Sequence, residues 1–375
     1  MKVLVINWRD IKNPEAGGAE VHIDEILKRK PKNWTVDFVC AKYKGCKEIE
    51  KIHGYTVYRI PNNFLFNFTF RKYWNKKFKY NNYDLIIDDI SKIPLATPRY
   101  ITNIPIIAIQ HHVHDKALFK ELPFYLAVYV FLMERYYLTF YKNTPTIVMA
   151  QSNKNELESK YQYKKVIISP TGIDIDFIRK SKKFKKNYYP TLIYFGRLKK
   201  YKRIDHILKA FSIVKKAIPE VKLWIGGKGE QESNLKMLAR RLKIDKDVSF
   251  FGSVSDRKKI ELLKRAWVYV IASEKEGWGL TVIEANAVGV PAVGYNVEGL
   301  RDSIKEGYSG FLVENNNINL FAKKVAYLLD DNKLLKKMSD QANKWASNFS
   351  WDNTAKDFYR IANSILIKKP EGELF

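Results

Sequence analysis

The sequence predicts an α/β protein built from two Rossmann-like domains, and three observations support that prediction. Short apolar segments typical of buried strands alternate with segments of helical periodicity, which favours mostly parallel, doubly wound sheets. Glycine-containing turns follow several of these strands, as in the first unit of a nucleotide-binding sheet. The 375 residues suffice for two domains of ordinary size.

The first domain is predicted to span residues 1–170. Its first strand covers residues 3–7, and a turn containing Gly17 and Gly18 leads into a helical pattern at residues 21–28. The spaced Gly-x-Gly-x-x-Gly of dinucleotide enzymes is absent, which argues against a nicotinamide cofactor. The further strands of this domain are predicted at residues 36–40, 55–60, 85–88, 104–109, 146–150 and 166–168.

Three histidines, His111, His112 and His114, directly follow the predicted strand at residues 104–109. Ligands of open α/β sheets bind at the carboxyl ends of strands, so these side chains are candidates for a binding site. They could instead be ordinary polar residues of a loop. Their spacing offers no clear tetrahedral ligand set, and we therefore predict no metal site.

The second domain is predicted to span residues 171–350, after a proline- and glycine-containing turn at residues 169–174. Its first strand is followed by Arg197, whose planar guanidinium suits phosphate oxygens, and by Lys202, which adds a positive charge. Another strand of this domain ends in a glycine turn that contains Gly227. The cations fit a diphosphate whose negative charge grows as it leaves.

The most distinctive stretch follows an apolar strand at residues 267–272. Gly277 and Gly279 permit backbone angles that other residues resist, and the helix after them directs free amides towards an anion. Glu276 and Glu284 bracket this site, and carboxylates accept hydrogen bonds from hydroxyls while they repel phosphate. An anion site beside two hydroxyl acceptors indicates a sugar nucleotide. The residues predicted to contact it here are Glu276, Gly277, Trp278, Gly279, Leu280, Thr281 and Glu284.

The composition limits the possible environments and partners. A net charge of +26, spread over both halves, favours anionic partners, although a lysine-rich solvated surface would give the same number. The two cysteines, Cys40 and Cys46, provide no disulfide framework. The first apolar run is too short for a signal peptide, and no segment has the length of a membrane span, so we expect a cytoplasmic protein.

Two segments, residues 64–80 and 119–142, combine aromatic residues with lysine or arginine. This composition suits a membrane interface, but helices that cover a sheet and expose their lysines to water would share it. For residues 119–142 we favour sheet-covering helices, and for residues 64–80 both interpretations stay open. The inner face of the cell membrane is therefore a candidate site of peripheral binding.

Together the motifs resemble those of the retaining glycosyltransferases of family 4. The resemblance lies in the Glu-x7-Glu motif at residues 276–284, in the Gly-Arg-Leu…Lys pattern that contains Arg197 and Lys202, and in the glycine turn at Gly17. It covers nearly the whole chain. It implies the GT-B fold, in which two Rossmann-like domains face each other across a cleft and the last helix, here within residues 351–375, crosses back to the first domain.

The resemblance also implies a reaction. A hexose would move from a UDP- or GDP-sugar to a glycan or lipid-linked saccharide, with retention of configuration and without a metal or other cofactor. The donor would bind mainly to the second domain and the acceptor to the first. Arg197 and Lys202 would stabilise the leaving diphosphate, Glu276 would bind hydroxyls of the sugar, and Glu284 would bind those of the ribose.

The resemblance assigns candidate roles in the first domain as well. His111 best matches the histidine that lies close to the donor sugar in this family, and His114 is the second choice. Gly17 and Gly18 would lie close to the donor phosphate and the acceptor. Gly227 of the second domain is a further candidate.

Two alternatives account for some of the same features. A sugar-nucleotide epimerase, a phosphorylase or another enzyme could share the fold, although no motif for a pyridoxal-phosphate lysine is present. A basic membrane- or nucleic-acid-binding protein could account for the charge. No nucleic-acid motif is present, so we expect no specific nucleic acid partner.

Overall fold

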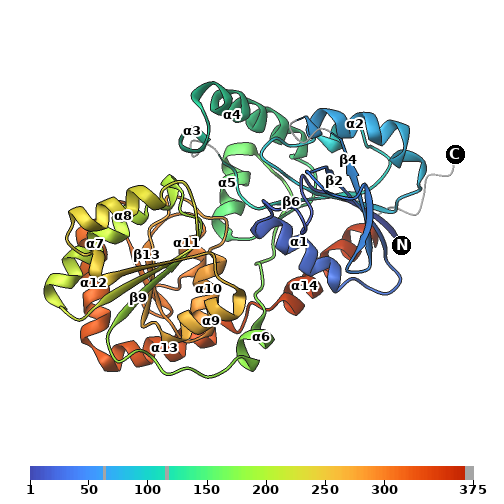
Figure 1. The fold of residues 1–375 in the computed structure, drawn as a ribbon. Helices are drawn as coiled ribbons and strands as arrows, with labels where there is room; N and C mark the ends of the chain where they lie inside the picture. The colour runs from blue at the N-terminus through green and yellow to red at the C-terminus, as the bar shows by residue number, and fades with distance from the viewer. Residues whose placement is uncertain (62–64, 115–117, 368–375) are drawn as a thin grey trace. The chain divides into compact units, whose positions relative to one another are not determined.

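The computed structural model describes residues 1–61, 65–114 and 118–367, and the chain forms two compact units (Figure 1). Unit 1 comprises Met1–Gly172 together with the segment that starts at Trp351, and unit 2 comprises Ile173–Ser350. The sequence analysis placed the first boundary after residue 170. Each unit contains a largely parallel sheet with helices against it, so the predicted α/β fold with two Rossmann-like domains is confirmed.

Within the described residues, unit 1 has an eight-stranded sheet in the order β3-β4-β2-β1-β5-β6-β7-β8. Its strands are β1 (Lys2–Ile6), β2 (Thr35–Ala41), β3 (Ile49–Ile52), β4 (Tyr55–Ile60), β5 (Leu85–Asp89), β6 (Ile106–Gln110), β7 (Thr146–Val148) and β8 (Val166–Ile168). Neighbours pair in parallel, except for the antiparallel pair of β3 and β4. The sequence analysis missed β3, because this largely exposed strand carries Glu50 and Lys51 and lacks an apolar run.

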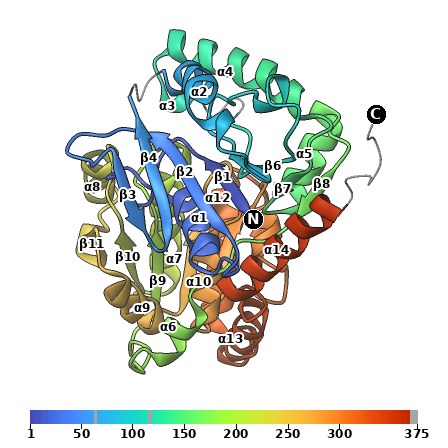
Figure 2. The ribbon, with the colours of Figure 1, turned by 90° about the vertical axis from the view of Figure 1, so that its right-hand side faces the viewer.

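The helices of unit 1 are α1 (Gly18–Lys28), α2 (Phe66–Lys76), α3 (Leu118–Glu121), α4 (Phe124–Leu138), α5 (Gln151–Tyr161) and α14 (Trp351–Ile367). α14 packs beside α1, where the Tyr359 hydroxyl donates a 2.7 Å hydrogen bond to the Ile26 carbonyl (Figure 2). The predicted return of the C-terminal helix to the first domain is therefore confirmed. Residues 368–375 of the predicted span lie outside the described residues.

One face of the unit 1 sheet is covered by both α2 and α4. Ile106 of β6 lies in a buried apolar cluster with Phe70 of α2. Ala108 lies in a neighbouring cluster with Leu138 of α4. Residues two apart on a strand point to the same face, so these two helices lie on the same side of the sheet, as Figures 1 and 2 show.

Unit 2 has a six-stranded parallel sheet in the order β11-β10-β9-β12-β13-β14. Its strands are β9 (Thr191–Phe195), β10 (Lys222–Gly226), β11 (Val248–Gly252), β12 (Val268–Ile271), β13 (Ala292–Tyr295) and β14 (Gly310–Val313). Its helices are α6 (Ile175–Lys180), α7 (Ile204–Ala217), α8 (Glu232–Arg241), α9 (Asp256–Arg265), α10 (Leu280–Ala287), α11 (Leu300–Ser303), α12 (Ile318–Asp330) and α13 (Asn332–Ala346). Because the strands run in the same direction, the loops after them gather at one edge.

In each sheet the chain reverses the direction in which it adds strands. In unit 1 this reversal occurs between β1 and β5, and in unit 2 it occurs between β9 and β12. The loops that leave two such neighbouring strands run to opposite sides, and open α/β sheets bind their ligands between them. The topology therefore directs attention to the carboxyl ends of these four strands.

Candidate active site

Unit 2 brings predicted residues together from the loops after β9 and β12. Lys202 Nζ lies 2.5 Å from Oε1 of Glu276, and the Ser273 hydroxyl donates to the same oxygen at 2.7 Å. Both charged side chains are largely buried, with 13% of Lys202 and 14% of Glu276 exposed. Burial alone would lower the pKa of Lys202, but the Glu276 carboxylate raises that pKa above its ordinary value, so Lys202 is a cation.

A second ion pair links the same two loops. Arg203 pairs with Glu274, and the Glu274 amide donates a 3.0 Å hydrogen bond to the Tyr201 carbonyl. These contacts fix the loop after β12 against the loop after β9. The sequence analysis gave no role to Arg203, Glu274 or Ser273. In so basic a chain, the sequence around an isolated polar residue does not show whether its side chain is paired or solvated.

Arg197 is exposed on the loop after β9, and its Nη2 donates to the Tyr201 hydroxyl at 3.2 Å. The loop after β10 supports this loop through Gly227, which has a φ of +124°. A Cβ at Gly227 would lie 1.9 Å from the Gly196 carbonyl oxygen, so only glycine permits this approach. The structure thus gives Gly227 a packing role beneath Arg197, and its contact with a donor stays a prediction.

The turn after Glu276 enters α10 through Gly279, whose φ of +86° lies in the left-handed region. A Cβ added there would lie 2.7 Å from Ser303 Oγ, so the position is closed to larger residues. Leu280 and Thr281 then form the first turn of α10. Amides in the first turn of a helix have no partner within the helix and attract anions.

Two side chains predicted near the donor are used to hold this turn. Trp278 is 7% exposed and packs edge-on against Phe349, with ring centroids 5.1 Å apart. Thr281 Oγ1 accepts a 2.7 Å hydrogen bond from the Tyr269 hydroxyl. Gly277 is partly exposed in the same turn. The backbone of the turn is therefore the part that we expect to face a ligand.

Glu284 lies one turn along α10 and pairs with Lys259 of α9, whose Nζ is 2.6 Å from Glu284 Oε1. Each of these side chains is 20% exposed. The sequence analysis did not predict Lys259, which looks like any other lysine of a basic helix. A ribose hydroxyl bound by Glu284 would share the carboxylate with this lysine.

Unit 1 gathers polar side chains at the carboxyl ends of β1, β5 and β6. His111, directly after β6, places Nε2 3.0 Å from Asp89 Oδ1, and Asn7 donates to Asp89 Oδ2 at 2.7 Å. Burial alone would lower the pKa of His111, but the charge of Asp89 raises that pKa above its ordinary value. The sequence analysis missed Asn7 and Asp89, although both stand at predicted strand ends where ligand-binding residues are expected.

His22 of α1 meets His111 edge to face, with ring centroids 5.2 Å apart and an interplanar angle of 90°. It is 1% exposed, and neither ring nitrogen has a hydrogen-bond partner among the described residues. Burial, and to a lesser extent the charge of His111, lowers the pKa of His22 well below its usual value. The pKa values of the two neighbouring rings are thus shifted in opposite directions.

The predicted glycine turn lies at the same sheet edge as His111. Gly17 and Gly18 are exposed at the start of α1, and the Gly17 amide donates to Glu20 Oε2 at 2.7 Å. A fully buried ion pair anchors the preceding loop, with Arg59 Nε 2.7 Å from Asp10 Oδ2. This ion pair ties the loop before the exposed turn to β4.

His114, the second choice from the sequence, has a different partner. Its ring Nδ1 and its backbone amide lie 3.0 and 2.9 Å from Glu134 Oε1 on α4. His114 therefore fastens α4, and His111 is the histidine beside the Asp89 carboxylate. In the part of the chain that the structure describes, no three His, Cys, Asp or Glu side chains are grouped as metal ligands. Metal independence stays a prediction.

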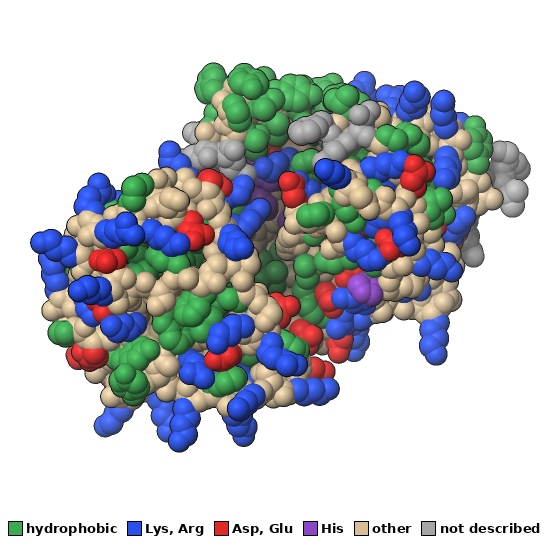
Figure 3. Space-filling model, in the orientation of Figure 1, with side chains coloured by type: hydrophobic (Ala, Val, Ile, Leu, Met, Phe, Trp, Pro, Cys, Tyr) green, Lys and Arg blue, Asp and Glu red, His purple; other side chains and the backbone are tan. Residues whose placement is uncertain are grey.

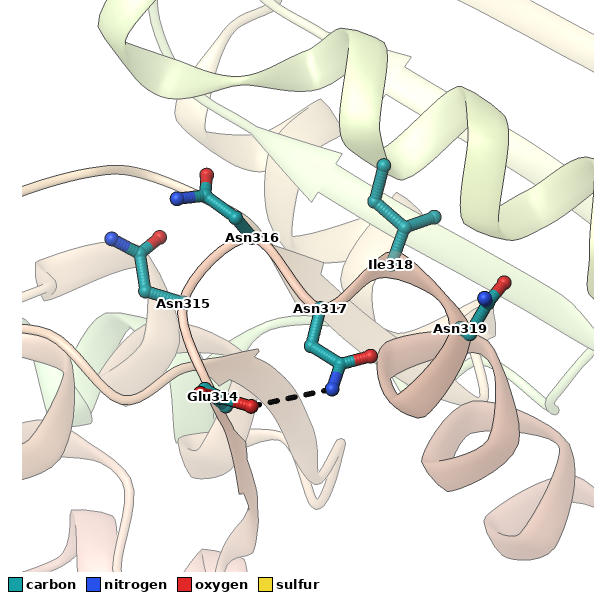
Figure 4. Close-up of a pocket in the computed structure, with 6 residues that line it drawn as sticks. All are labelled: Glu314, Asn315, Asn316, Asn317, Ile318 and Asn319. Carbon is teal, nitrogen blue, oxygen red and sulfur yellow. Dashed lines mark hydrogen bonds between the residues drawn. The ribbon is translucent and has the colours of Figure 1, made fainter.

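An open hollow of about 570 Å³ lies where β14 leads into α12, and Figure 4 shows the residues that line it. It is lined by residues 314–319, and Asn317 Nδ2 donates to Glu314 Oε2 at 3.3 Å. None of the residues predicted from the sequence lines it. We assign no role to this hollow.

Family comparisons identify both halves of the chain. Residues 16–177 match the family model described as Glycosyltransferase Family 4, and residues 174–345 match the one described as Glycosyl transferases group 1. An uncharacterized glycosyltransferase from Haemophilus influenzae is 32% identical over 172 residues, which cover 46% of this chain and 48% of that protein. An uncharacterized glycosyltransferase from Methanocaldococcus jannaschii is 26% identical, with 96% of this chain and 98% of that protein covered.

A third relative, the poly(glycerol-phosphate) alpha-glucosyltransferase from Bacillus subtilis, is 33% identical over 48% of this chain and 27% of its own length. The chain thus spans half or less of the length of two of these three relatives. The match to the Methanocaldococcus jannaschii protein runs through both units.

Solved structures share the fold of the whole chain. Sucrose-phosphate synthase from Thermosynechococcus elongatus superposes with a TM-score of 0.78 at 19% identity, covering 98% of this chain and 99% of that one. HepE from Anabaena in complex with UDP-glucose superposes with a TM-score of 0.73 at 19% identity, covering 97% and 100%. These two likenesses concern the fold alone. Since each unit matches a glycosyltransferase family in sequence, the chain belongs to the GT-B glycosyltransferases of the family 4 and group 1 type.

Proposed function

We propose that this glycosyltransferase moves a hexose from a nucleoside-diphosphate sugar to a glycan or lipid-linked saccharide, with retention of anomeric configuration. The observation that carries the proposal is the buried pair of Lys202 and Glu276 at the switch point of unit 2. This pair sets a phosphate-binding cation beside a hydroxyl-binding carboxylate. In a nucleoside-diphosphate sugar, one glycosidic bond joins a phosphate to a sugar that carries hydroxyls.

The leaving diphosphate gains negative charge as its bond to the sugar breaks. Arg197 and Lys202, with the amides at the start of α10, would stabilise that charge in a partly buried site. A bound diphosphate would share Lys202 with Glu276, and a sugar hydroxyl would donate to Glu276. We propose that these groups do the electrostatic work without a metal ion.

The acceptor is proposed to bind unit 1, near Gly17 and His111. Asp89 pairs with the His111 ring and raises its pKa, and below that raised pKa the charged ring would donate a hydrogen bond to an oxygen of the donor sugar. Retention would follow if the leaving phosphate takes the proton of the acceptor on the face from which it departs. That route requires no nucleophile from the protein.

The named relatives favour a uridine donor that carries glucose. The Anabaena structure holds UDP-glucose, and the Bacillus subtilis relative is an alpha-glucosyltransferase by name. UDP-glucose is therefore the first donor to test, and GDP-hexoses are the second. Both units match glycosyltransferase families. No observation specifically supports the epimerase or the nucleic-acid-binding alternative.

A panel of UDP- and GDP-hexoses tests the proposal. The protein should release nucleoside diphosphate from one of these donors, slowly to water and faster once a suitable saccharide or lipid-linked acceptor is added. Proton NMR of the product should show the anomeric configuration of the donor. An inverted product would contradict retention, and release from no donor by folded protein would contradict the transferase proposal.

A further inference from the structure

The helix α4 exposes a continuous apolar stripe. Successive residues of a helix are 100° apart, so positions spaced by four, three and four share one side. Tyr125, Tyr129, Leu132 and Tyr136 have this spacing and are 71%, 41%, 54% and 52% exposed. We call these four residues the α4 outer face. Figure 3 shows hydrophobic side chains gathered over α3 and α4.

The opposite side of α4 carries the carboxylate of the helix. Ala127, Glu134 and Leu138 are the buried residues of the helix, and Glu134 is held there by His114. A helix that only covers a sheet in water has its apolar stripe inside and its carboxylates outside. The sequence analysis favoured sheet-covering helices for residues 119–142. α4 does cover the sheet, but its inner contact leaves its aromatic stripe uncovered.

The neighbouring α2 has the complementary arrangement. Its Phe66, Phe70 and Trp74 are buried in the core, whereas Phe68 is 50% exposed. Phe64 lies outside the described residues. No carboxylate occurs between residues 65 and 83. The exposed cations on and just after α2 are Arg71, Lys72, Lys76, Lys77 and Lys79.

We propose that the α4 outer face docks on an anionic lipid bilayer, with its tyrosines at the headgroup level and the cations of α2 towards the lipid phosphates. The exposed cations of α2 favour an anionic bilayer as the partner of this surface. They lie beside the apolar stripe, since α2 and α4 cover the same face of the sheet. In the described ranges no helix is long and apolar enough to cross a bilayer, so the contact is at the surface. The inference deepens the proposed function, because docking would bring a lipid-linked acceptor to unit 1.

Vesicle co-sedimentation tests the proposal without requiring turnover, so it can fail while the transferase proposal stands. Extruded vesicles of phosphatidylcholine alone are compared with vesicles that also contain phosphatidylglycerol. The variant Tyr125→Gln/Tyr129→Gln/Tyr136→Gln keeps good helix formers at exposed positions. The matched control, Met237→Gln/Tyr327→Gln, changes side chains of unit 2 that are 58% and 54% exposed. Thermal unfolding verifies that each variant is folded.

Wild type and the control should bind anionic vesicles, and the α4 variant should bind them at least about tenfold more weakly, because aromatic burial and charge act together at an anionic interface. Donor hydrolysis without vesicles should be the same in all three proteins. Binding by the α4 variant equal to wild type would overturn the proposal, as would equal wild-type binding to neutral and anionic vesicles or binding to neither. A dimer that the α4 variant dissociates in solution, without vesicle binding, would instead assign the face to a second copy.

Discussion

Lys202 and Glu276 form an ion pair of 2.5 Å across the loops that follow the two switch-point strands of unit 2. The Ser273 hydroxyl contacts the same carboxylate oxygen, Oε1. A carboxylate has a second oxygen, and Oε2 is the atom that we expect a sugar hydroxyl to reach. The pair therefore fixes a carboxylate that we propose binds a sugar hydroxyl beside a cation that we propose binds phosphate.

Arg197→Ala should reduce turnover by about 100-fold or more without unfolding the protein, because it removes one charge-stabilising donor from the leaving diphosphate. The measurement is the steady-state rate of donor hydrolysis or transfer. Lys200→Ala, which removes an exposed cation a few residues along the same loop, is the matched control and should stay near the wild-type rate. Near-normal turnover of a folded Arg197→Ala protein would reject the assignment.

Substitution of Glu284 and substitution of Glu276 should weaken the binding of different ligands. Glu284→Gln should weaken free nucleoside diphosphate and intact donor alike, since both contain the ribose. Glu276→Gln should bind free diphosphate almost normally and slow transfer by about 10- to 100-fold, since a hydrogen bond to a charged group contributes about 1.5–3 kcal/mol. Calorimetric titrations with each ligand, beside single-turnover rates, make the comparison.

If both carboxylate variants lose free-diphosphate affinity equally, the division between sugar and ribose is wrong. If neither loses anything, the two carboxylates serve only their lysine partners. Lys259→Met provides the companion measurement, because it frees Glu284 from its ion pair. It should leave donor binding intact if the ribose can use the carboxylate without that lysine.

Activity should survive treatment with EDTA. If Arg197 and Lys202 neutralise the diphosphate as proposed, no metal ion is needed for that task, so a chelator should change the initial rate little. The measurement is donor turnover after dialysis against EDTA, with and without added Mg²⁺ or Mn²⁺. Loss of activity that a divalent ion restores would reject metal independence.

The raised pKa of His111 predicts a pH limit on the alkaline side. Its folded pKa lies above the ordinary 6.5, so the ring keeps its charge through that pH and loses it only as the pH rises through the raised value. If the charged ring binds the donor sugar, kcat/KM should fall in that window. The stability that the pair with Asp89 provides is also full below 6.5 and lost in the same window.

The pH profile of His111→Gln should lack this alkaline limb, because glutamine does not titrate. His53→Gln is the matched control, since it changes another paired histidine of unit 1, 46% exposed, and it should keep the limb. An identical profile for wild type and His111→Gln would show that another group sets the alkaline limit.

The parts that the sequence predicted well are those encoded by neighbouring residues. The strand ends, the glycine turns and the spacings Arg197 to Lys202 and Glu276 to Glu284 each lie within one short segment, so local pattern suffices. The contact of Lys202 with Glu276 joins residues 74 positions apart and is not local. The contact of His111 with Asp89 depends on strand register between β5 and β6, and that of His22 depends on how α1 packs. Neither can be obtained from spacing along the chain.

The orientation of α4 was unpredictable for another reason. Its apolar residues occupy nearly every side of the helix, so periodicity gives no direction for the inner face. The buried carboxylate of Glu134 decides the direction through His114, twenty residues earlier in the chain. A polar contact of this kind cannot be predicted from hydrophobic periodicity.

The position of α14 has a consequence for how the chain is made. Unit 2 is one uninterrupted stretch, whereas unit 1 is built from segments that lie before and after it in the chain. A ribosome therefore delivers all of unit 2 before Tyr359 can reach the Ile26 carbonyl on α1. Until then the buried side of α1 lacks its cover, and the domain that starts first is the one completed last.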